Sequence, residues 1–417
     1  MTVAPALDLD RLLERSRRAA RLIAGADRRA GLLAIARAVE EQTERILAAN
    51  SADVEAETKR GTPASRVDRL TLDQDRLAAV AAAVRQVADL PDPLGRVLDG
   101  WRLENGLEVR KVSVPFGVIG MIYESRPNVT VDAAVLALKA GSASVLRGSS
   151  NALASNRVLV DVMRSALASV DIPADAVLLI DSPDRQLVTE LLAARGKVDL
   201  VIPRGGASLI SHVVENAKVP VIETGVGNCH VYVDAAADLA KARAIVFNAK
   251  VQRPSVCNAA ETLLVHESVA DGFLPGILQD LADAGVELVG CPRARPFHPA
   301  MGEATEADWA EEYLDLKLAV RVIGDVGEAI EHIGRYGTQH SESIVTEDRA
   351  TGRRFQAEVD AAAVIVNAST RFTDGFEFGF GAEIGISTQK LHARGPMGLA
   401  EIVTHKYLMD GDGQIRG

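Results

Sequence analysis

The sequence predicts an α/β protein with two parallel-sheet domains and a small β-hairpin. Residues 8–95 show a helical spacing of apolar side chains, an Asn-Gly pair at 105–106 separates two strand-like segments, and from 117 short apolar runs alternate with helical segments. This alternation is typical of parallel sheets, and strands that are apolar on both sides predict helices on both faces of each sheet. The 417 residues suffice for two or three domains.

The N-terminal part is expected to be a set of helices. Apolar side chains line one face in each of three stretches, 12–23, 32–39 and 77–87. The segment LPDPLG at 90–95 then ends the pattern, because prolines and a glycine between periodic segments mark a loop.

A hairpin is expected next. Asn-Gly is a strong signal for a two-residue turn, and the arm at 107–114 that follows it alternates between polar and apolar residues. The tail at 401–408 reads as an exposed strand that could pair with this arm, including across a subunit contact. We therefore expect a homo-oligomer.

Two sets of strands follow the hairpin. The first set is expected at 118–123, 143–146, 176–180, 198–202 and 219–222. The second set is expected at 230–233, 262–265, 286–289, 316–323 and 343–345. Helices fill the gaps within both sets. The apolar segment 363–366 reads as a last strand that returns to the first domain.

Charge and composition argue against several classes of protein. The net charge is −11, and an acidic surface disfavours binding to nucleic acid or to an anionic membrane. No apolar stretch reaches the ~18 residues that a membrane span needs. The N-terminus lacks the apolar core of a secretion signal. We therefore expect a cytoplasmic protein.

The cysteines and histidines indicate neither a disulfide framework nor a metal site. Cys229, Cys257 and Cys291 form an odd, sparse set, which fits a reducing compartment. The eight histidines are scattered, and neither Cys-x-x-Cys nor His-Glu-x-x-His occurs. We therefore expect no bound metal.

Cys257 is the strongest candidate for chemistry. It follows a polar turn at 253–255 and precedes an apolar strand. Lys250 and Arg253 are close enough in sequence to lower the thiol pKa from its usual value of about 8.5. A thiolate at the mouth of a strand can form a thioester, and Glu223, at the end of another predicted strand, can take a proton. The alternative is a small, buried core cysteine.

Two strand ends carry features of a phosphate site. Gly205 and Gly206 stand between a predicted strand and a helix, whose free N–H groups could bind phosphate. The alternative is a generic strand–helix turn. Arg147 ends another strand beside Ser149, and its guanidinium could bind a ribose 2′-phosphate. The alternative is a solvated surface arginine.

Two later segments leave both a functional and a structural interpretation open. His340 lies in a donor-rich stretch and could contact an anionic substrate, and the alternative is an ordinary capping role. The glycine- and phenylalanine-rich stretch 376–385 is either a mobile loop over a cleft or a packed interdomain loop.

Four stretches resemble the aldehyde dehydrogenase superfamily, and the resemblance runs from the first helices to the last strand. They are GVIGMIYESRPNVT at 117–130, VQRPSVCNAAE at 251–261, HIGRYGTQHSESI at 332–344 and GAEIGISTQKLHARGP at 381–396. The last three are much longer than chance motifs and indicate a branch of the superfamily that reduces an acyl phosphate.

The resemblance implies catalytic roles by position. Cys257 resembles the superfamily nucleophile, and Glu223 resembles its glutamate base. Asn128 resembles the side-chain amide that holds the oxyanion together with the Cys257 backbone N–H. Each such donor typically supplies ~3 kcal/mol of transition-state stabilisation.

The resemblance also implies how a nicotinamide cofactor is held. Glu312 resembles the carboxylate that binds the nicotinamide ribose. Gly205, Gly206 and Ser208 fall where the superfamily cradles the pyrophosphate. Arg147, with Ser149 beside it, stands where many relatives have a lysine.

The implied reaction is reductive. NADPH would reduce L-glutamyl 5-phosphate to L-glutamate 5-semialdehyde and phosphate through a Cys257 thioester, as the second step of proline biosynthesis from glutamate. Candidates to hold the phosphate or the α-carboxylate are Arg126, Lys250, Arg253 and His340. A glutamate kinase, which supplies the acyl phosphate, is a candidate partner.

The resemblance assigns the predicted elements to domains. Residues 1–98 and 115–226 would form the cofactor-binding domain, and 227–362 the catalytic domain. Residues 363–397 would return to the cofactor-binding domain and supply an active-site loop. The oligomerisation strands would come from 99–114 and 398–417.

Three other functions stay open. One is an NAD(P)-dependent aldehyde dehydrogenase that oxidises another semialdehyde, which would need an activated water and no phosphate site. Another is a thiol acyltransferase that uses no nicotinamide, and the third is a non-catalytic binding protein. A phosphate requirement and NADPH binding would separate these from the reductase.

Overall fold

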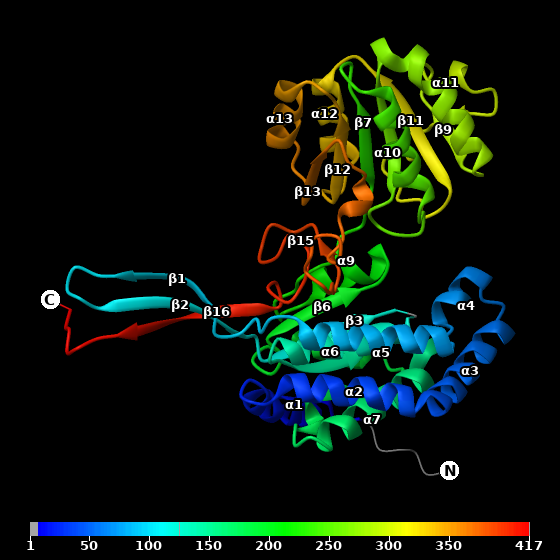
Figure 1. Ribbon diagram of the computed structural model, residues 1–417. Helices are drawn as coiled ribbons and strands as arrows, with labels where there is room; N and C mark the ends of the chain where they lie inside the picture. The colour runs from blue at the N-terminus through cyan, green and yellow to red at the C-terminus, as the bar shows by residue number, and fades with distance from the viewer. Residues whose placement is uncertain (1–6, 125, 417) are drawn as a thin grey trace. The chain divides into compact units, whose positions relative to one another are not determined.

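The computed structural model describes residues 7–124 and 126–416, which divide into two compact units. Unit 1 contains the chain up to Glu223 together with Phe380–Gly385 and the segment from Met397 onward. Unit 2 contains Thr224–Gly379 and Ile386–Pro396. Each unit has its own parallel sheet, so the predicted α/β class is confirmed (Figure 1).

Five helices begin unit 1, in the region predicted to be helical. They are α1 (Leu9–Ile23), α2 (Arg28–Glu41), α3 (Thr43–Lys59), α4 (Ala64–Leu70) and α5 (Gln74–Asp89). Asp8, Asp27 and Asp73 start α1, α2 and α5, and each carboxylate accepts a hydrogen bond from the backbone N–H three residues later. Such caps typically contribute ~1 kcal/mol each, so these helix starts are encoded locally.

The sheet of unit 1 has four parallel strands in the order β5-β4-β3-β6. The strands are β3 (Val118–Tyr123), β4 (Ala143–Arg147), β5 (Val177–Leu179) and β6 (Leu200–Arg204). The helices between and after them are α6 (Pro127–Lys139), α7 (Leu153–Ala168), α8 (Gln186–Ala193) and α9 (Ala207–Asn216). Helices α1, α6, α7 and α9 pack against the strands.

The expected fifth strand at 219–222 forms only a single bridge, between Val201 and Val221. The Val201 N–H donates to the Pro220 carbonyl at 2.9 Å, and the Ile222 N–H donates to the Val201 carbonyl at 3.0 Å. The next hydrogen bond of a parallel ladder would come from the N–H of residue 203. Because that residue is Pro203, which has no N–H, the ladder stops there.

The strand order of this sheet changes direction between β3 and β6. From β3 the chain moves through β4 to β5 on one side, and β6 then lies on the other side of β3. In open α/β sheets, ligands bind at the carboxyl ends of the strands at such a switch point. Tyr123 and Arg204 are register partners at this end, so the residues that follow them line the switch point.

An exposed three-stranded ribbon belongs to unit 1. Strands β1 (Val97–Arg102), β2 (Glu108–Pro115) and β16 (Val403–Asp410) pair antiparallel in the order β1-β2-β16, and Figure 1 shows the ribbon projecting from the helices of the unit. The pairing of the C-terminal strand with the second hairpin arm is thus confirmed, within one chain. Trp101 and Tyr407 lie edge to face across it, with ring centroids 6.2 Å apart.

The hairpin turn differs from the expected two-residue type. Leu103 and Leu107 still pair, and the Gly106 N–H donates to the Leu103 carbonyl at 2.9 Å. Gly106 has φ of 87°, whereas Asn105 keeps a negative φ. The loop is therefore a three-residue turn in which only the glycine adopts the left-handed conformation.

The sheet of unit 2 has seven parallel strands in the order β10-β9-β11-β8-β7-β12-β13. The strands are β7 (Cys229–Val233), β8 (Ala260–His266), β9 (Glu287–Gly290), β10 (Gly302–Glu303), β11 (Lys317–Ile323), β12 (Ser341–Val345) and β13 (Ala363–Val366). The helices are α10 (Leu239–Val251), α11 (Glu267–Asp283), α12 (Val326–Tyr336) and α13 (Arg349–Glu358).

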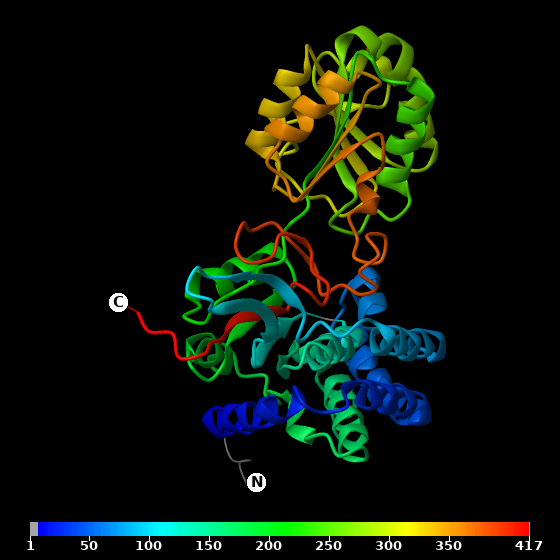
Figure 2. The same ribbon diagram turned by 60° about the vertical axis from the view of Figure 1, so that its left-hand side comes forward.

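Helices cover both faces of this second sheet, as the doubly apolar strands predict. Figure 2 shows α10 and α11 on one side and α12 and α13 on the other. Each side has its own buried cluster: Phe273 and Leu274 belong to the α10–α11 cluster, and Tyr232 and Phe355 belong to the α12–α13 cluster. The sheet is thereby fixed from both sides, and with it the loops at its ends.

The strand at 363–366 corrects the expected domain organisation. It pairs with β12 in the sheet of unit 2 and does not return to the first domain. Of the segment assigned to that return, only Phe380–Gly385 and Met397 lie in unit 1, whereas Ile386–Pro396 lies in unit 2. An apolar strand reads the same in either sheet, so its sequence does not reveal its neighbour.

Six short elements complete the described chain. They are the 3-10 turns η1 (Ser150–Ala152), η2 (Ala174–Ala176), η3 (Arg295–Phe297) and η4 (Thr370–Phe372), and the paired strands β14 (Ile386–Ser387) and β15 (Gly395–Pro396).

Candidate active site

Cys257 lies on the loop that joins α10 to β8 in unit 2. Its side chain is half-buried, unlike that of Cys229, which is fully buried. The polar turn that precedes Cys257 and the apolar strand that follows it are found as predicted. The partial exposure leaves the thiol accessible, which a core cysteine would not be.

A buried ion pair joins the two ends of this loop. Lys250, in the last turn of α10, lies 2.5 Å from Glu261 in β8, and neither side chain is exposed. Burial lowers the Lys250 pKa and raises the Glu261 pKa to about 7, and the pair itself opposes both shifts. Glu261 also accepts the Leu314 N–H at 3.2 Å. The structure therefore does not support Lys250 as a substrate ligand, because its ammonium group is held by Glu261.

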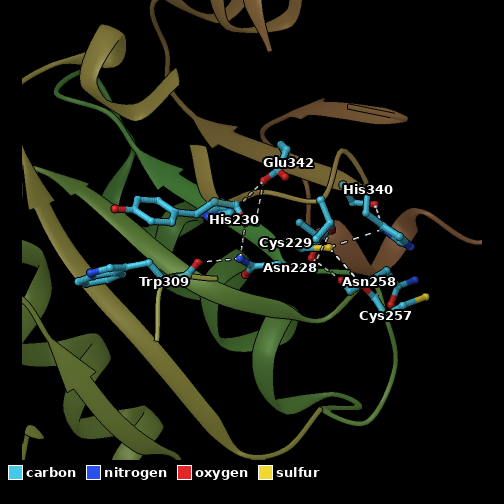
Figure 3. A network of polar contacts seen from close by, with 12 residues as sticks. Asn228, Cys229, His230, Cys257, Asn258, Trp309, His340 and Glu342 are labelled. Carbon is cyan, nitrogen blue, oxygen red and sulfur yellow. Dashed lines mark hydrogen bonds and ion pairs between the residues drawn. The ribbon is translucent and has the colours of Figure 1, made fainter. Parts of the chain in front are cut away.

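The residues at the start of β7 contact the backbone of Cys257. The Cys229 thiol donates to the Cys257 carbonyl at 3.2 Å, and Figure 3 shows the Cys257 thiol pointing away from this contact. A Cβ atom on Gly227 would fall 1.5 Å from the same carbonyl oxygen. Only glycine fits at 227 with the loop in this position. Burial raises the pKa of Cys229 well above its usual value, so Cys229 stays a thiol.

His340 is part of this support and lies inside unit 2. It is fully buried, and its Nδ1 atom lies 2.8 Å from the Ser341 hydroxyl and 3.6 Å from the Cys229 sulfur (Figure 3). Burial lowers the His340 pKa to about 4, so the ring is neutral at pH 7. The prediction that His340 binds an anionic substrate is therefore not supported.

A second buried pair lies beside these residues. His230 and Glu342, on the neighbouring strands β7 and β12, are 2.9 Å apart and fully buried (Figure 3). Asn228 precedes His230, and its side-chain amide donates to the Trp309 carbonyl at 2.7 Å and the Tyr336 carbonyl at 2.9 Å. These hydrogen bonds cross-link the segments around β7, and a buried network of this kind restrains the residues that contact the Cys257 loop.

The far side of the loop is tied to η4. The Thr370 hydroxyl donates to the Asn258 carbonyl at 2.7 Å, and the Asn258 amide donates to the Thr373 carbonyl at 2.8 Å. Arg371, between them, donates to the side chain of Gln252 at 2.8 Å. The loop that carries Cys257 is thus fixed by the ion pair at its two ends, by the start of β7 and by η4.

Arg371 is a candidate that sequence reasoning missed. Burial lowers its pKa, the charge of Arg253 adds to the effect, and Cys257 is among the groups whose charge opposes it. The guanidinium group of half-buried Arg371 therefore interacts with Cys257, and that of exposed Arg253 interacts with Arg371. The only sequence signal is a cation in a short polar segment before the phenylalanine-rich stretch.

Glu312 lies in the same unit and faces the start of β7. Its half-buried carboxylate accepts the Gly227 N–H at 2.7 Å. Burial raises the Glu312 pKa, and this hydrogen bond opposes the shift. Gly227 therefore contacts both the carboxylate predicted to bind a ribose and the carbonyl of Cys257.

Asn128 lies in the first turn of α6 in unit 1. Its amide donates to the Asp132 carboxylate one turn later at 3.1 Å, and both side chains are half-buried. Burial raises the Asp132 pKa to about 6, and the Asn128 amide and the charge of Arg204 oppose the shift. Arg126 precedes the helix as its N-cap residue.

Arg147 is a buried cation that has no carboxylate partner among the described residues. It is 7% exposed, and its hydrogen bonds go to the carbonyls of Gly148 and Pro183, while Nε has no partner. Burial lowers its pKa. Half-buried Ser149 follows on the same strand end. The alternative of a solvated surface arginine is excluded, and the pair fits an anionic ligand.

Gly205 and Gly206 precede α9 at the switch point, and both are exposed. The Gly206 N–H is bonded at 3.0 Å to the carboxylate of Glu124, which follows β3. A carboxylate at the N-terminus of α9 stands in for an anion, so this position suits a pyrophosphate. Ser208 lies exposed in the first turn of the helix.

Glu223 is the last residue of unit 1, after the single bridge of Val221.

No described helix combines the length and the apolar character that a membrane crossing requires. Among the described residues, no group of three or more His, Cys, Asp or Glu side chains is arranged to hold a metal ion.

Comparison with known proteins identifies the family. The model of the aldehyde dehydrogenase family matches residues 2–314. A gamma-glutamyl phosphate reductase of Moorella thermoacetica is 57% identical and one of Thermobifida fusca 56%, over 99% and 98% of this chain and 99% of each relative. A crystal structure of gamma-glutamyl phosphate reductase from Thermotoga maritima, 50% identical, matches with a TM-score of 0.96 over 99% of this chain and 100% of that one. This chain therefore belongs to the aldehyde dehydrogenase family and, within it, to the gamma-glutamyl phosphate reductases.

Proposed function

We propose that this chain reduces L-glutamyl 5-phosphate to L-glutamate 5-semialdehyde and phosphate with NADPH, through a thioester on Cys257. The observation that carries the proposal is a half-buried thiol on a loop fixed from several sides, in a chain 57% identical to a gamma-glutamyl phosphate reductase. A nucleophile held in one position gains rate because little orientational freedom is lost on reaching the transition state.

The first step is acyl transfer to sulfur. The Cys257 thiolate attacks the C5 carbonyl carbon, the bond from that carbon to the phosphate oxygen breaks, and inorganic phosphate leaves with the electron pair. Arg253 and Arg371 favour this step, because nearby cations stabilise a thiolate and a departing phosphate. The product of the step is a thioester.

The second step is reduction of that thioester. NADPH, when bound, supplies the hydride that the thioester carbonyl carbon accepts. The resulting thiohemiacetal loses its hydroxyl proton and expels the Cys257 thiolate, which releases the semialdehyde. We assign the proton handling to Glu223. The Asn128 amide and the Cys257 N–H would stabilise the oxyanion of each step, with a typical contribution of ~3 kcal/mol per donor.

The residues of unit 1 fit the anionic groups of NADPH. Arg147, a buried cation with an unpartnered Nε atom, would hold the ribose 2′-phosphate with Ser149. Gly205, Gly206 and Ser208 would hold the pyrophosphate, where Glu124 now accepts the Gly206 N–H. In unit 2, Glu312 would bind the nicotinamide ribose. Arg126 and Arg253 are proposed to hold the α-carboxylate and the phosphate of the substrate.

The test is the reverse reaction, measured as reduction of NADP⁺ by L-glutamate 5-semialdehyde with and without inorganic phosphate. The wild type should require phosphate, and Cys257→Ala should lose activity by at least about 10⁴-fold, because no other group replaces the nucleophile. Rapid oxidation without phosphate would indicate an ordinary aldehyde dehydrogenase. Full activity of Cys257→Ala would overturn the thioester mechanism.

We propose a cytoplasmic location, since the free cysteines suit a reducing compartment. We propose a homo-oligomer assembled through the exposed ribbon β1-β2-β16, and light scattering of a Trp101→Glu variant would reveal a smaller particle. A glutamate kinase is the proposed supplier of the acyl phosphate. Direct transfer between the two enzymes would be excluded if an added trap for free acyl phosphate stopped product formation completely.

A further inference from the structure

Asp132 is placed beside the proposed oxyanion amide. It follows Asn128 by four residues on α6, so the two side chains share one face of the helix. The Asn128 amide donates to Asp132 at 3.1 Å. Both side chains are half-buried and reach the surface of unit 1. A molecule that contacts the Asn128 amide therefore also lies close to the Asp132 carboxylate.

This acid has no cation partner. Asp132 forms no ion pair with any residue in the described part of the chain, and Arg204, at the end of β6, is the cation whose charge reaches it. Burial raises its pKa to about 6, because the negative charge of the carboxylate loses contact with water and gains few stabilising partners. At pH 7 it is still mainly ionised. Its oxygens can accept several hydrogen bonds, of which Asn128 supplies one.

Four other acids near the proposed site residues have donors of a kind that Asp132 lacks. Each of four carboxylates already accepts from a cation or a backbone N–H of the described residues: Glu124, Glu261, Glu312 and Glu342. Among these five acids, Asp132 alone is bonded only to a neutral side-chain amide. It is therefore the acid with most capacity left for a ligand that carries positive charge.

The substrate of the proposed function carries one such group. L-Glutamyl 5-phosphate is an anion at its phosphate and α-carboxylate, and its only cation is the α-ammonium group. Two methylene groups separate the reacting carbonyl carbon from the carbon that bears this ammonium. A chain of that length is comparable with the rise between Asn128 and Asp132, which are four residues apart on the helix and therefore roughly 6 Å apart along its axis.

We infer that Asp132 binds the α-ammonium group of the substrate while Asn128 binds its carbonyl oxygen, so that the two residues of one helix face select an α-amino acid derivative. The inference rests on the proposed function. It makes Asp132 a specificity-determining residue: it favours L-glutamate 5-semialdehyde over the same aldehyde without an amino group. A site built to bond a charged group rejects analogues that lack it, because its own polar group is left unpaired.

The experiment compares two substrates in the phosphate-dependent reverse reaction, L-glutamate 5-semialdehyde and its deaminated analogue 5-oxopentanoate. Asp132→Asn removes the charge but keeps an oxygen that can accept from Asn128. We expect it to lower kcat/KM for the amino substrate by roughly 10- to 100-fold, and to change kcat/KM for the analogue by less than about 3-fold. Cyclisation of the amino substrate cancels, since each enzyme meets the same fraction of open-chain aldehyde.

Two further variants separate binding from positioning. Asp132→Ala also removes the acceptor of the Asn128 amide, so it should slow both substrates and the amino substrate more. Asp75→Asn removes one exposed charge in the first turn of α5 of the same unit and should change neither rate. If Asp132→Asn and Asp132→Ala lower kcat/KM equally for both substrates, Asp132 only positions Asn128 and the inference is overturned. A wild type that shows no phosphate-dependent activity would instead overturn the proposed function.

Discussion

Two regions of the molecule hold their charged side chains in opposite ways. Around the Cys257 loop in unit 2, buried acids are paired with buried basic side chains, as Glu261 is with Lys250 and Glu342 with His230. In unit 1, Arg147 at the end of β4 has no carboxylate partner and Asp132 on α6 has no cation partner among the described residues. Paired charges position a nucleophile, whereas unpaired ones have capacity for a ligand. The difference separates the residues that hold the site from those proposed to bind substrate and cofactor.

Breaking the buried pair should produce the largest effect. Lys250→Met leaves the Glu261 carboxylate buried without its cation, so we expect the free energy of unfolding to fall by about 3–5 kcal/mol. Urea denaturation followed by circular dichroism measures it. The double variant Lys250→Met/Glu261→Gln should recover part of the loss, because no unpaired charge remains. Equal stability of single variant and wild type would show that the pair does not hold the loop.

Adding one methyl group at Gly227 should mainly affect the rate. The new Cβ would overlap the Cys257 carbonyl, so the loop must shift, and a displacement of about 1 Å in a nucleophile typically costs ~100-fold in kcat. Gly334→Ala is the matched control: it lies in α12 with no atom within 4 Å of the added group. The control should keep full activity and gain roughly 0.5–1 kcal/mol of stability. Similar kcat values for the two variants would contradict the proposed support of the loop.

The raised pKa of Asp132 predicts a pH-dependent stability. A carboxyl group whose pKa rises from 3.8 to about 6 on folding binds more protons in the native state between these values. Stability from this group is therefore full at low pH and is lost as the pH rises through 6. Between pH 4 and 7, the free energy of unfolding of the wild type should fall by about 1 kcal/mol relative to that of Asp132→Asn. Partial exposure of the carboxylate to solvent keeps the effect this small. Parallel thermal unfolding curves at every pH would contradict this.

An exposed pair of the same chemistry should have the smallest effect. Lys59 and Glu55 on α3 lie 2.6 Å apart, close to the distance in the buried pair, but their side chains are 72% and 66% exposed. Glu55→Gln should change the free energy of unfolding by less than about 0.5 kcal/mol and leave kcat unchanged. A loss comparable with that of Lys250→Met would mean that burial does not explain the contrast.

Most of the fold could be predicted from the sequence because it is encoded locally. Strand β3 was predicted with its bounds, since an apolar run ends at the polar residue Glu124. The neighbour of β13 was not predictable, because pairing with β12 or with the first sheet satisfies the same apolar side chains. The bridge at Val221 stayed short because of Pro203, which lies on the partner strand and not in the segment itself.

The candidate site was predicted less completely than the fold. Cys257 stood out by its sequence context, and Arg147 by its place at the end of a strand. The sequence suggests Lys250 and His340 as substrate ligands because charge and polarity in a sequence do not reveal burial or partners. Arg371 was missed because its link to the nucleophile loop is a hydrogen bond to Gln252, 119 residues away in the chain.

Acylation of Cys257 is the central claim, and mass spectrometry of the intact protein tests it most directly. Wild-type enzyme given L-glutamyl 5-phosphate without NADPH should gain the mass of one glutamyl group, on the peptide that contains Cys257. The adduct should disappear when NADPH is added, and Cys257→Ala should never form it. An unmodified wild type, or an adduct on Cys229 or Cys291 with Cys257 free, would contradict the account.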